Sequence, residues 1–526
     1  MTEHRKSWLL FAIVGLTTVL QVLIASSSGL WVDEIFSLSM ATGHSLEHPA
    51  AAADPAKGDF VEPRQPVPAE QFLRYLKHDD PPSSPTRVVR AVLLSDTNPP
   101  LYYLLLYVWT LIFGTSDMAL RSFSIICSLA CLPLLVNLAR RIGGEVAILP
   151  TYVLFTFSPL AIYYSTEGRM YSLLWLCVLA TAWASLLLQE RGGNAATCAL
   201  WIVSSVAGFL THYFFVFPWL AILAYLLVRP GKLMRVHLAA CVLLVAVMIL
   251  PWYFNLPKSL GSWRVTKDWL KWRPRGFDQL TSFRDLVLQF FSCRTKLWLD
   301  HPLSGTAALI GFAVVGGAIA WRLGIHMFGG QRLLLWLLFI AACTGPLVFD
   351  LIQHTYTVAV PRYAIAALPS AYLLAGLALA CLDARARLII LILIVLAWVP
   401  DILSLYRNRL ASLAIRPIAR AASANSLSSD LILVHSIPSG VLGIARYAAG
   451  RAPLAAWVGQ LGNRWVPDSV FTLATGRSRI IFVAVHTVRE PAPEEKWLRG
   501  NAVVCHETRI GSGRIVEFQP VNSKTF

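Results

Sequence analysis

Eleven apolar runs, each long enough to cross a bilayer, constrain the fold of this 526-residue chain more than any other feature. A helix needs roughly 20 apolar residues to cross the hydrocarbon core of a membrane. The chain is 56% hydrophobic and only 14% charged, whereas a soluble domain carries much more charge. We therefore expect a polytopic α-helical membrane protein, with spans near residues 7–30, 118–139, 146–165, 170–189, 195–213, 214–229, 236–255, 303–321, 333–352, 363–382 and 388–405.

A twelfth apolar segment, residues 99–114, is shorter and opens with two prolines. If it does not cross and the N-terminus is cytoplasmic, the short cytoplasmic segments carry twelve Lys and Arg residues, and the short outer turns carry only Arg169 and Arg362. If it did cross, every later segment would be inverted and the positive-inside rule would be broken. We therefore expect a juxtamembrane helix at 99–114 within a large outer loop, 31–117. In this arrangement much of the net charge of +16 comes from basic residues in short cytoplasmic loops that set the membrane topology. No nucleic-acid partner is therefore expected.

The sequence changes character after the last span. Residues 406–526 contain the alternating runs "LILVHS", "RIIFVAVHT" and "RIVEFQP", which predict strands, and "GVLGIARYAAG", which predicts a helix. We expect a membrane domain at 1–405, with outer loops 31–117 and 256–302, followed by a small α/β domain at 406–526 outside the membrane.

An acidic pair, Asp33 and Glu34, follows the first span directly in "GLWVDEIFSL". Ionisable residues at a membrane border are costly and are a reason to look for a function. A carboxylate here is suited to act as a general base toward a hydroxyl or amine, or to hold a divalent ion. An ordinary polar helix end is the competing interpretation.

Two further polar segments lie on the same side of the membrane in this topology. "SDTNPPLYY" carries Asn98 and Tyr102, and "YYSTEGRMY" carries Glu167, Arg169 and Tyr171. An Arg side chain binds phosphate through paired donors, and a neighbouring acid orients it or binds a metal. A proline-started interfacial helix and a local salt bridge are the simpler interpretations.

The outer ends of two other spans carry polar and aromatic pairs. His212 and Tyr213 end the fifth span, and Arg362 and Tyr363 begin the tenth. Histidine binds metal ions or donates to phosphate, and Arg362 is a further phosphate ligand. Interfacial anchoring is the alternative for both pairs.

The outer loop 256–302 is basic and aromatic over "LPKSLGSWRVTKDWLKWRPRGF", where Lys267 and Lys271 alternate with tryptophans. This composition suits an anionic lipid substrate, with cations on phosphate and Trp at the interface. Attraction to bulk anionic lipid explains the same composition equally well.

Five segments occur in a characteristic order: "WVDEIFSLSMA", "NPPLYYLLLYVWTLIFGTSDMALRSFS", "SPLAIYYSTEGRMYSL", "THYFFVF" and "PRYAIAALPSAYLL". Together they resemble the GT-C-fold integral membrane glycosyltransferases. The resemblance is to the bacterial branch related to protein O-mannosyltransferases and the lipid A aminoarabinose transferase, and it covers roughly residues 7 to 405.

This resemblance implies an inverting transfer of a hexosyl or pentosyl group from a polyprenyl-phosphate-linked donor. The acceptor would be a cell-envelope lipid, glycan or protein, reached on the periplasmic side of the bacterial inner membrane. It implies a catalytic Asp33 with Glu34 beside it, and it matches Glu167 to the second acidic motif. Asn98 stands where relatives often have His or Lys, which is a departure from the family pattern.

The residues expected to bind the donor phosphate are Arg169, Arg362, Lys267, Lys271 and Tyr363, and the other candidates are Asn98, Tyr102, Tyr171, His212 and Tyr213. Several relatives show a divalent ion near the site, and a metal held by Asp33, Glu167 and His212 is left open. A lipid or sugar transporter or flippase is the alternative function. Transporters place ionisable residues near the midplane and often have repeated halves, whereas these candidates cluster at one face.

Overall fold

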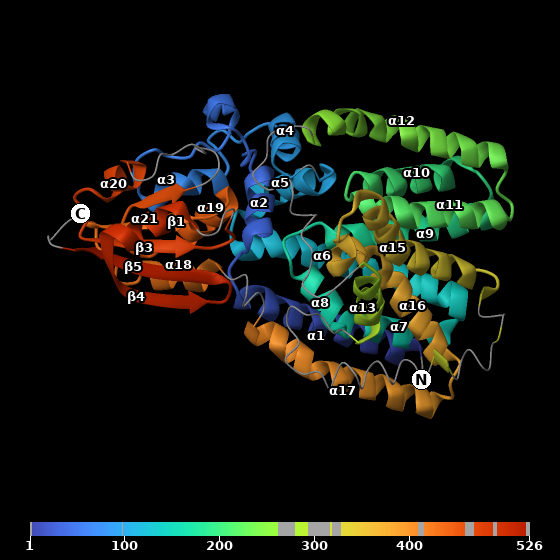
Figure 1. Cartoon of the computed structure of the whole chain (residues 1–526). Coiled ribbons are helices and arrows are strands. Elements are labelled where there is room, and N and C mark those ends of the chain that lie inside the picture. Colours follow the sequence, from blue (N-terminus) through green and yellow to red (C-terminus); the bar gives the residue numbers. More distant parts are fainter. Residues whose placement is uncertain are drawn as a thin grey trace. The chain divides into compact units, whose positions relative to one another are not determined.

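The computed structural model contains two compact units, and we describe each by itself (Figure 1). The first unit comprises Met1–Ser27, Arg121–Asn255 and Asp268–Arg409, and the second comprises Ser28–Leu120, Leu256–Lys267 and Leu410–Phe526. The structure describes residues 3–526 except 97, 261–278, 293–315, 318–323, 325–327, 409–414, 458–467, 488–491 and 522–525.

Apolar helices build the first unit. Within the described residues, six helices are long and apolar enough to cross a membrane. They are α1 (Glu3–Ser27), α6 (Asp117–Gly143), α9 (Tyr171–Arg191), α12 (Arg235–Leu260), α15 (Arg332–Gln353) and α17 (Ala384–Asn408). Each coincides with a run expected from the sequence, so the expected polytopic helical fold is confirmed.

Other expected spans are broken or short. Helices α7 (Glu145–Phe157) and α8 (Pro159–Ser165) meet at a 59° bend and together form one broken span. The bend follows from Pro159, which cannot continue the hydrogen-bonded ladder of α7. The remaining expected spans are shorter apolar helices: α10 (Ala195–Phe209), α11 (Val216–Val228) and α16 (Leu368–Ala380). The run expected at 303–321 lies almost wholly outside the described residues, and α13 (Gln279–Ser292) occupies part of the loop expected at 256–302.

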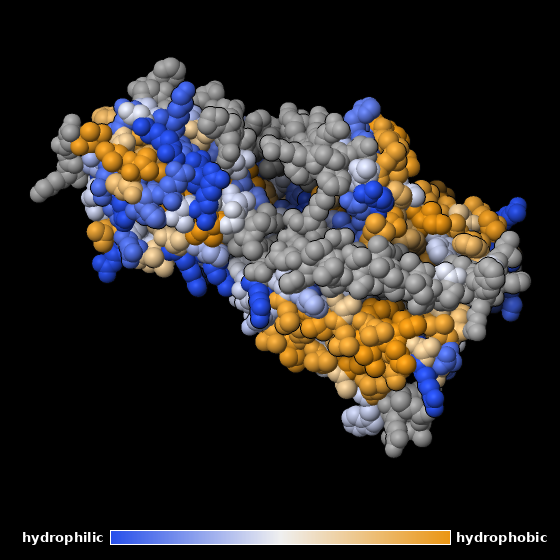
Figure 2. Space-filling model, turned by 60° about the horizontal axis from the view of Figure 1, so that its bottom comes forward, coloured by the Kyte–Doolittle hydropathy of each residue, from blue (hydrophilic) through white to orange (hydrophobic). Residues whose placement is uncertain are grey.

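Helix α17 shows how this unit meets lipid. Figure 2 shows hydrophobic side chains gathered over the face that α17 forms, toward the bottom of the view. Among the exposed apolar side chains of α17 are Leu388, Ile389, Ile392, Leu393 and Leu396. Contiguous apolar surface of this kind is rare on soluble monomers, and it suits the hydrocarbon of a bilayer.

A five-stranded sheet forms the C-terminal part of the second unit. Its order is β2-β1-β3-β5-β4, with β1 (Asp430–His435), β2 (Leu454–Trp457), β3 (Arg479–Ala484), β4 (Ala502–Ile510) and β5 (Gly513–Pro520). β2, β1 and β3 are parallel, and β5 pairs antiparallel with β3 and β4. Helices α18 (Ile415–Ser423), α19 (Pro438–Tyr447), α20 (Asp468–Ala474) and α21 (Pro493–Asn501) accompany it. The three alternating runs expected to be strands form β1, β3 and β5, whereas sequence analysis did not predict β2 and β4.

The segment from Ser28 to Leu120 belongs to the same compact unit. It contains α2 (Val32–Ala41), α3 (Ala69–Leu73), α4 (Pro85–Ser95) and α5 (Leu101–Phe113), with short 3₁₀ turns η1 (Ala50–Ala52), η2 (Pro55–Lys57) and η3 (Arg74–Leu76). Helix α19 packs against α2 and α3. The sequence predicted the helix α5 correctly, but it gave no indication that this segment packs with the C-terminal sheet.

A buried carboxylate holds the long segment together. Asp59 is fully buried and accepts hydrogen bonds from Ser45 Oγ (2.6 Å), the Arg90 guanidinium (Nη2, 2.8 Å) and the Asp54 amide (2.9 Å). Burial alone would raise the pKa of Asp59, but hydrogen bonds from Arg90, His48 and Ser45 outweigh it and hold that pKa well below its usual range. This carboxylate therefore joins residues 45 and 90 across the segment.

His44, next to this cluster, makes the segment sensitive to acid. Burial lowers the pKa of His44 to about 4, and the carboxylate of Asp79 offsets only part of this. The unfolded chain takes up the proton near pH 6.5 while the folded chain does not, so stability is complete above that pH and is lost as pH falls toward 4.

We expect acidification from pH 7.5 to about pH 5 to destabilise the second unit by about 2 kcal/mol through His44. The measurement is the thermal unfolding midpoint of the purified protein in detergent at both pH values. His44→Gln should flatten this dependence, whereas His506→Gln, at an exposed position of β4, should leave it unchanged. An equally steep dependence in His44→Gln would contradict the assignment.

Candidate active site

The structure divides the sequence-predicted site residues between the two units. Trp31, Asp33, Glu34, Asn98 and Tyr102 belong to the second unit. Glu167, Arg169, Tyr171, His212, Tyr213, Arg362 and Tyr363 belong to the first. Lys267 and Lys271 lie outside the described residues.

Helix α2 gives the two acids of the second unit different environments. Trp31 is extended (φ −102°, ψ 176°), the helix begins at Val32, and Glu34 Oε2 accepts a hydrogen bond from the Trp31 amide at 3.2 Å. Glu34 is fully buried, whereas Asp33 is half-buried. Acidic groups in a first turn also suit the positive end of the helix dipole. Glu34 is therefore placed to cap the helix, and Asp33 is the more accessible carboxylate.

Helix α5, which packs against α2, carries the other candidates of this unit. Tyr102 is buried and meets the ring of Tyr103 edge-on at 5.4 Å, and the Tyr103 hydroxyl donates to Asp96 Oδ2 at 2.8 Å. Asn98 is half-buried just before Pro99 and Pro100. The proline-started helix thus presents its tyrosines inward, beside α2.

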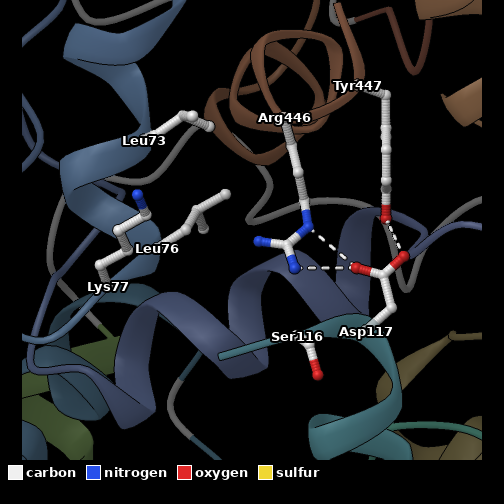
Figure 3. A pocket seen from close by; sticks show the side chains of 7 residues that line it. All are labelled: Leu73, Leu76, Lys77, Ser116, Asp117, Arg446 and Tyr447. Carbon is white, nitrogen blue, oxygen red and sulfur yellow. Dashed lines mark hydrogen bonds and ion pairs between the residues drawn. The ribbon is translucent and has the colours of Figure 1, made fainter. Parts of the chain in front are cut away.

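A charged cluster fixes the chain just before α2 (Figure 3). Asp117, at the start of α6, accepts hydrogen bonds from Arg446 Nε (2.9 Å), Arg416 Nη2 (2.7 Å) and the Tyr447 hydroxyl (2.6 Å). The Tyr447 hydroxyl in turn accepts the amide of Leu30 at 2.7 Å. The cluster borders a cavity of about 400 Å³ that Leu73, Leu76, Lys77 and Ser116 also line. Asp117 therefore connects α18 and α19 to the residue that precedes Trp31.

Sequence reasoning missed this cluster. Its only local signal is an acid at the start of a span, and its partner Arg446 lies 329 residues further along the chain.

We expect Tyr447→Phe to destabilise the second unit by about 1–3 kcal/mol, because it leaves the Leu30 amide without its acceptor and removes a donor from Asp117. The measurement is denaturant or thermal unfolding of the purified protein. The matched control is Tyr406→Phe, since Tyr406 on α17 is 49% exposed. Equal stability of the two variants would show that the hydroxyl of Tyr447 does not hold this junction.

In the first unit, the hairpin between α8 and α9 buries an acid and a base. Ser158 Oγ caps α8 by accepting from the Ala161 amide at 3.2 Å, and the Arg169 amide donates to the Glu167 carbonyl at 2.7 Å. Ser124 Oγ on α6 donates to the Arg169 carbonyl at 3.1 Å. Glu167 is 1% and Arg169 5% exposed. The turn is thus held by a backbone hydrogen bond and by two serine hydroxyls, and both charged side chains are buried.

Aromatic contacts join this hairpin to two other predicted site segments. Tyr171 lies 6.3 Å from the His212 ring, and Phe214 of η4 (Tyr213–Phe215) lies 5.8 Å from His212 and 5.3 Å from Tyr363, all measured between ring centroids. The Arg362 guanidinium carbon is 5.3 Å from the centre of the Tyr363 ring. Tyr164 interacts electrostatically with both Glu167 and Arg362. The structure therefore brings together the first-unit residues that the sequence placed at one membrane face.

Asp350, at the end of α15, positions the segment that carries Arg362. Its buried carboxylate accepts from Thr355 Oγ1 (2.6 Å) and from the amides of Thr357 and Val358 (2.8 Å each). The chain then forms η7 (Thr357–Ala359), η8 (Pro361–Tyr363) and η9 (Ile365–Ala367) before α16. Sequence analysis missed Asp350, which read only as a polar residue near a span end.

Arg121 is a second residue that sequence analysis missed. It is fully buried in α6, and its Nη1 donates to the Ala25 carbonyl at 2.6 Å. It lies three residues from Ser124, so both are on the same face of α6. Its signal was a lone Arg within an apolar run of the quoted segment "DMALRSFS".

Within the described part of the chain, no group of three or more His, Cys, Asp or Glu side chains is arranged to hold a metal ion.

Comparison with known proteins identifies the fold. Residues 97–254 match the dolichyl-phosphate-mannose-protein mannosyltransferase family. No curated protein sequence matches the chain.

Two crystal structures of ArnT from Cupriavidus metallidurans resemble the whole chain. The form bound to undecaprenyl phosphate has a TM-score of 0.60 at 15% identity and covers 99% of both chains. The apo form has a TM-score of 0.62 at 15% identity and covers 100% of both chains. The chain therefore has the GT-C fold that its resemblance implied.

Proposed function

We propose that this multi-pass membrane protein is an inverting glycosyltransferase that uses a polyprenyl-phosphate-linked sugar. It transfers a hexosyl or pentosyl group to a lipid, glycan or protein of the cell envelope, on the periplasmic side of the bacterial inner membrane. The observation that carries the proposal is a half-buried carboxylate, Asp33, at the first turn of the helix that follows the first span of a GT-C fold. The polyprenyl-phosphate donor is supported by the undecaprenyl phosphate bound to ArnT.

Asp33 is the general base in this proposal. It takes the proton of the acceptor hydroxyl or amine as that atom attacks the anomeric carbon of the donor sugar. The bond between the anomeric carbon and the phosphate oxygen breaks, and polyprenyl phosphate leaves with the electron pair. Because the attack comes from the side opposite the leaving group, the anomeric configuration inverts. Glu34 contributes by capping α2 and so fixing the direction of Asp33.

Arginines of the first unit stabilise the phosphate as it gains charge. Arg169 and Arg362 each offer paired donors that match phosphate oxygens. Glu167 orients the arginine side chains. The ring of Tyr363 makes a cation–π contact with the guanidinium of Arg362, whose carbon is 5.3 Å from the ring centre. Arg121, which is fully buried on α6, is a further guanidinium of this unit. Lys267 and Lys271 are proposed to attract the anionic donor from the bilayer.

We expect Asp33→Asn to reduce sugar transfer by at least about 100-fold, because a positioned general base contributes 10²–10⁴-fold. The measurement is the initial rate of transfer from polyprenyl-phosphate sugars to envelope acceptors by membrane-incorporated protein. Glu70→Gln is the matched control, since Glu70 is exposed on α3 of the same unit. A near wild-type rate for Asp33→Asn would refute the mechanism, and a transporter would be the next hypothesis to test.

We expect Arg362→Ala to weaken undecaprenyl phosphate binding about tenfold, because it removes a charge-assisted contact to phosphate. The measurement is the shift in thermal unfolding midpoint as undecaprenyl phosphate is titrated into the protein in nanodiscs. Arg385→Ala is the control, since Arg385 is exposed at the start of α17 in the same unit. Equal binding curves for the two variants would remove Arg362 from the phosphate site.

A further inference from the structure

The C-terminal sheet has the connectivity that creates a ligand site in open α/β sheets. From β1 the chain passes through α19 to β2 on one side, and β3 lies on the other side of β1. At such a switch point, ligands bind outside the carboxyl ends of the two central strands. The residues that follow those ends are Ser436 and Ser439 after β1, and His486 after β3.

Both serines present hydroxyl groups that the rest of the described chain does not use. Ser436 is 1% exposed and Ser439 0% exposed, and neither Oγ has a hydrogen-bond partner among the described residues. Buried hydroxyls nearly always have a partner. A Cβ on Gly440 would lie 1.9 Å from Ser436 Oγ, so the first turn of α19 approaches this hydroxyl closely. These two hydroxyl groups are thus donors and acceptors at the carboxyl end of β1 that no described residue uses.

His486 is held in a backbone conformation that is unfavourable for its residue type. Its φ is 45°, in the left-handed region that non-glycine residues rarely adopt. Such strained positions concentrate where a site needs a side chain in one direction. The Nε2 atom of His486 is buried without a hydrogen-bond partner in the described part of the chain. The Nε2 atom is therefore a further unused donor or acceptor at the carboxyl ends of these strands.

The carboxyl ends of β1 and β3 lie beside α2, the helix that carries Asp33, the general base of the proposed mechanism. α19 packs against α2, and the carboxylate of Asp33 acts electrostatically on His486. Burial lowers the pKa of His486 and the charge of Asp33 opposes this, so near neutral pH the ring is an uncharged hydrogen-bonding group. All of these residues belong to the second unit.

Resting on the proposed function, we propose that His486, Ser436 and Ser439 bind the acceptor beside Asp33, and that the bound part of the acceptor is carbohydrate. Two hydroxyls and a neutral imidazole match the hydroxyl groups of a sugar, each of which both donates and accepts. An acceptor with an anionic group at this site would need a cationic side chain to bind it. The basic residue of α19, Arg446, is already paired with Asp117. His486 makes no bond in the reaction: it positions the acceptor hydroxyl whose proton Asp33 removes.

The test uses variants chosen for the backbone of position 486. His486→Gly removes the imidazole and suits the left-handed conformation, so it should fold with a thermal midpoint at or above that of the wild type. His486→Asn tolerates the same conformation and restores one short donor and acceptor. His506→Ala, at an exposed position of β4 in the same sheet, is the matched control.

Three measurements are made on the full chain in nanodiscs. Saturation-transfer NMR measures binding of methyl β-D-glucoside, methyl β-D-galactoside and N-acetylglucosamine, with inorganic phosphate as competitor. Sugar transfer rates are measured with membranes from cells that lack the gene for this protein. These membranes supply the acceptor, and their dilution varies the acceptor concentration. Thermal shifts with undecaprenyl phosphate report the donor side separately.

We expect His486→Gly to weaken glycoside binding and to raise the apparent KM for acceptor membranes about tenfold, the effect of leaving a polar group unpaired. Undecaprenyl phosphate binding should be unchanged, His486→Asn should recover part of the loss, and His506→Ala should match the wild type. Glycoside binding and KM within twofold of wild type in His486→Gly would overturn the proposal.

Two other outcomes would also overturn the carbohydrate assignment: no glycoside binding to the wild type, or complete displacement of the glycosides by inorganic phosphate. Failure of the wild type to bind undecaprenyl phosphate or to transfer sugar would count against the proposed function instead. Glycoside binding that depends on His486 would then still support a carbohydrate site at the carboxyl ends of β1 and β3.

Discussion

The hydroxyl of Tyr447 is the contact on which the placement of Asp33 depends most directly. It accepts the amide of Leu30 and donates to Asp117, which also holds Arg416 and Arg446. One carboxylate thereby joins the start of α6, two helices of the C-terminal part and, through Tyr447, the residue that precedes Trp31. This polar cluster, in which both oxygens of Asp117 accept hydrogen bonds, fixes Leu30 just ahead of Trp31 and α2.

Other buried carboxylates act in the same way. Asp350 accepts hydrogen bonds from two hydroxyls and two amides and so shapes the turn before Arg362. Asp59 binds Ser45 and Arg90 across the long segment of the second unit. Removing a charge from water is costly unless every oxygen is bonded. Each carboxylate therefore permits essentially one arrangement of the loop around it, and irregular segments acquire defined geometry without regular secondary structure.

Sequence was sufficient where structure follows from local pattern. Apolar runs predicted α1, α6, α9, α12, α15 and α17 because a bilayer leaves few alternatives to a helix, and apolar alternation predicted β1, β3 and β5. The charge bias of the loops predicted that Glu167, Tyr171, His212 and Arg362 lie at one membrane face, and the structure places these residues in one connected group.

What the sequence left unpredicted depends on pairing over distance or on a single backbone angle. Nothing local distinguishes Glu34, which caps α2 through the Trp31 amide, from its neighbour Asp33. Asp117 pairs with Arg446 only after folding brings together two positions that are 329 residues apart in the chain. The left-handed conformation of His486 follows from the end of β3, and no residue type in "VAVHT" requires it.

These distant pairings give the C-terminal part a definite mechanical consequence. Because α19 packs on α2 and its Tyr447 holds Leu30, the part of the chain that carries Ser436 and His486 is joined to the helix that carries Asp33. In the proposed mechanism the general base and the groups that orient its substrate must keep a fixed separation, since misplacement by about 1 Å can cost 100-fold in rate. Building both on one compact unit meets that requirement through helix packing together with hydrogen bonds and ion pairs. It also explains why α2, a short helix of ten residues, is stabilised from outside rather than by its own length.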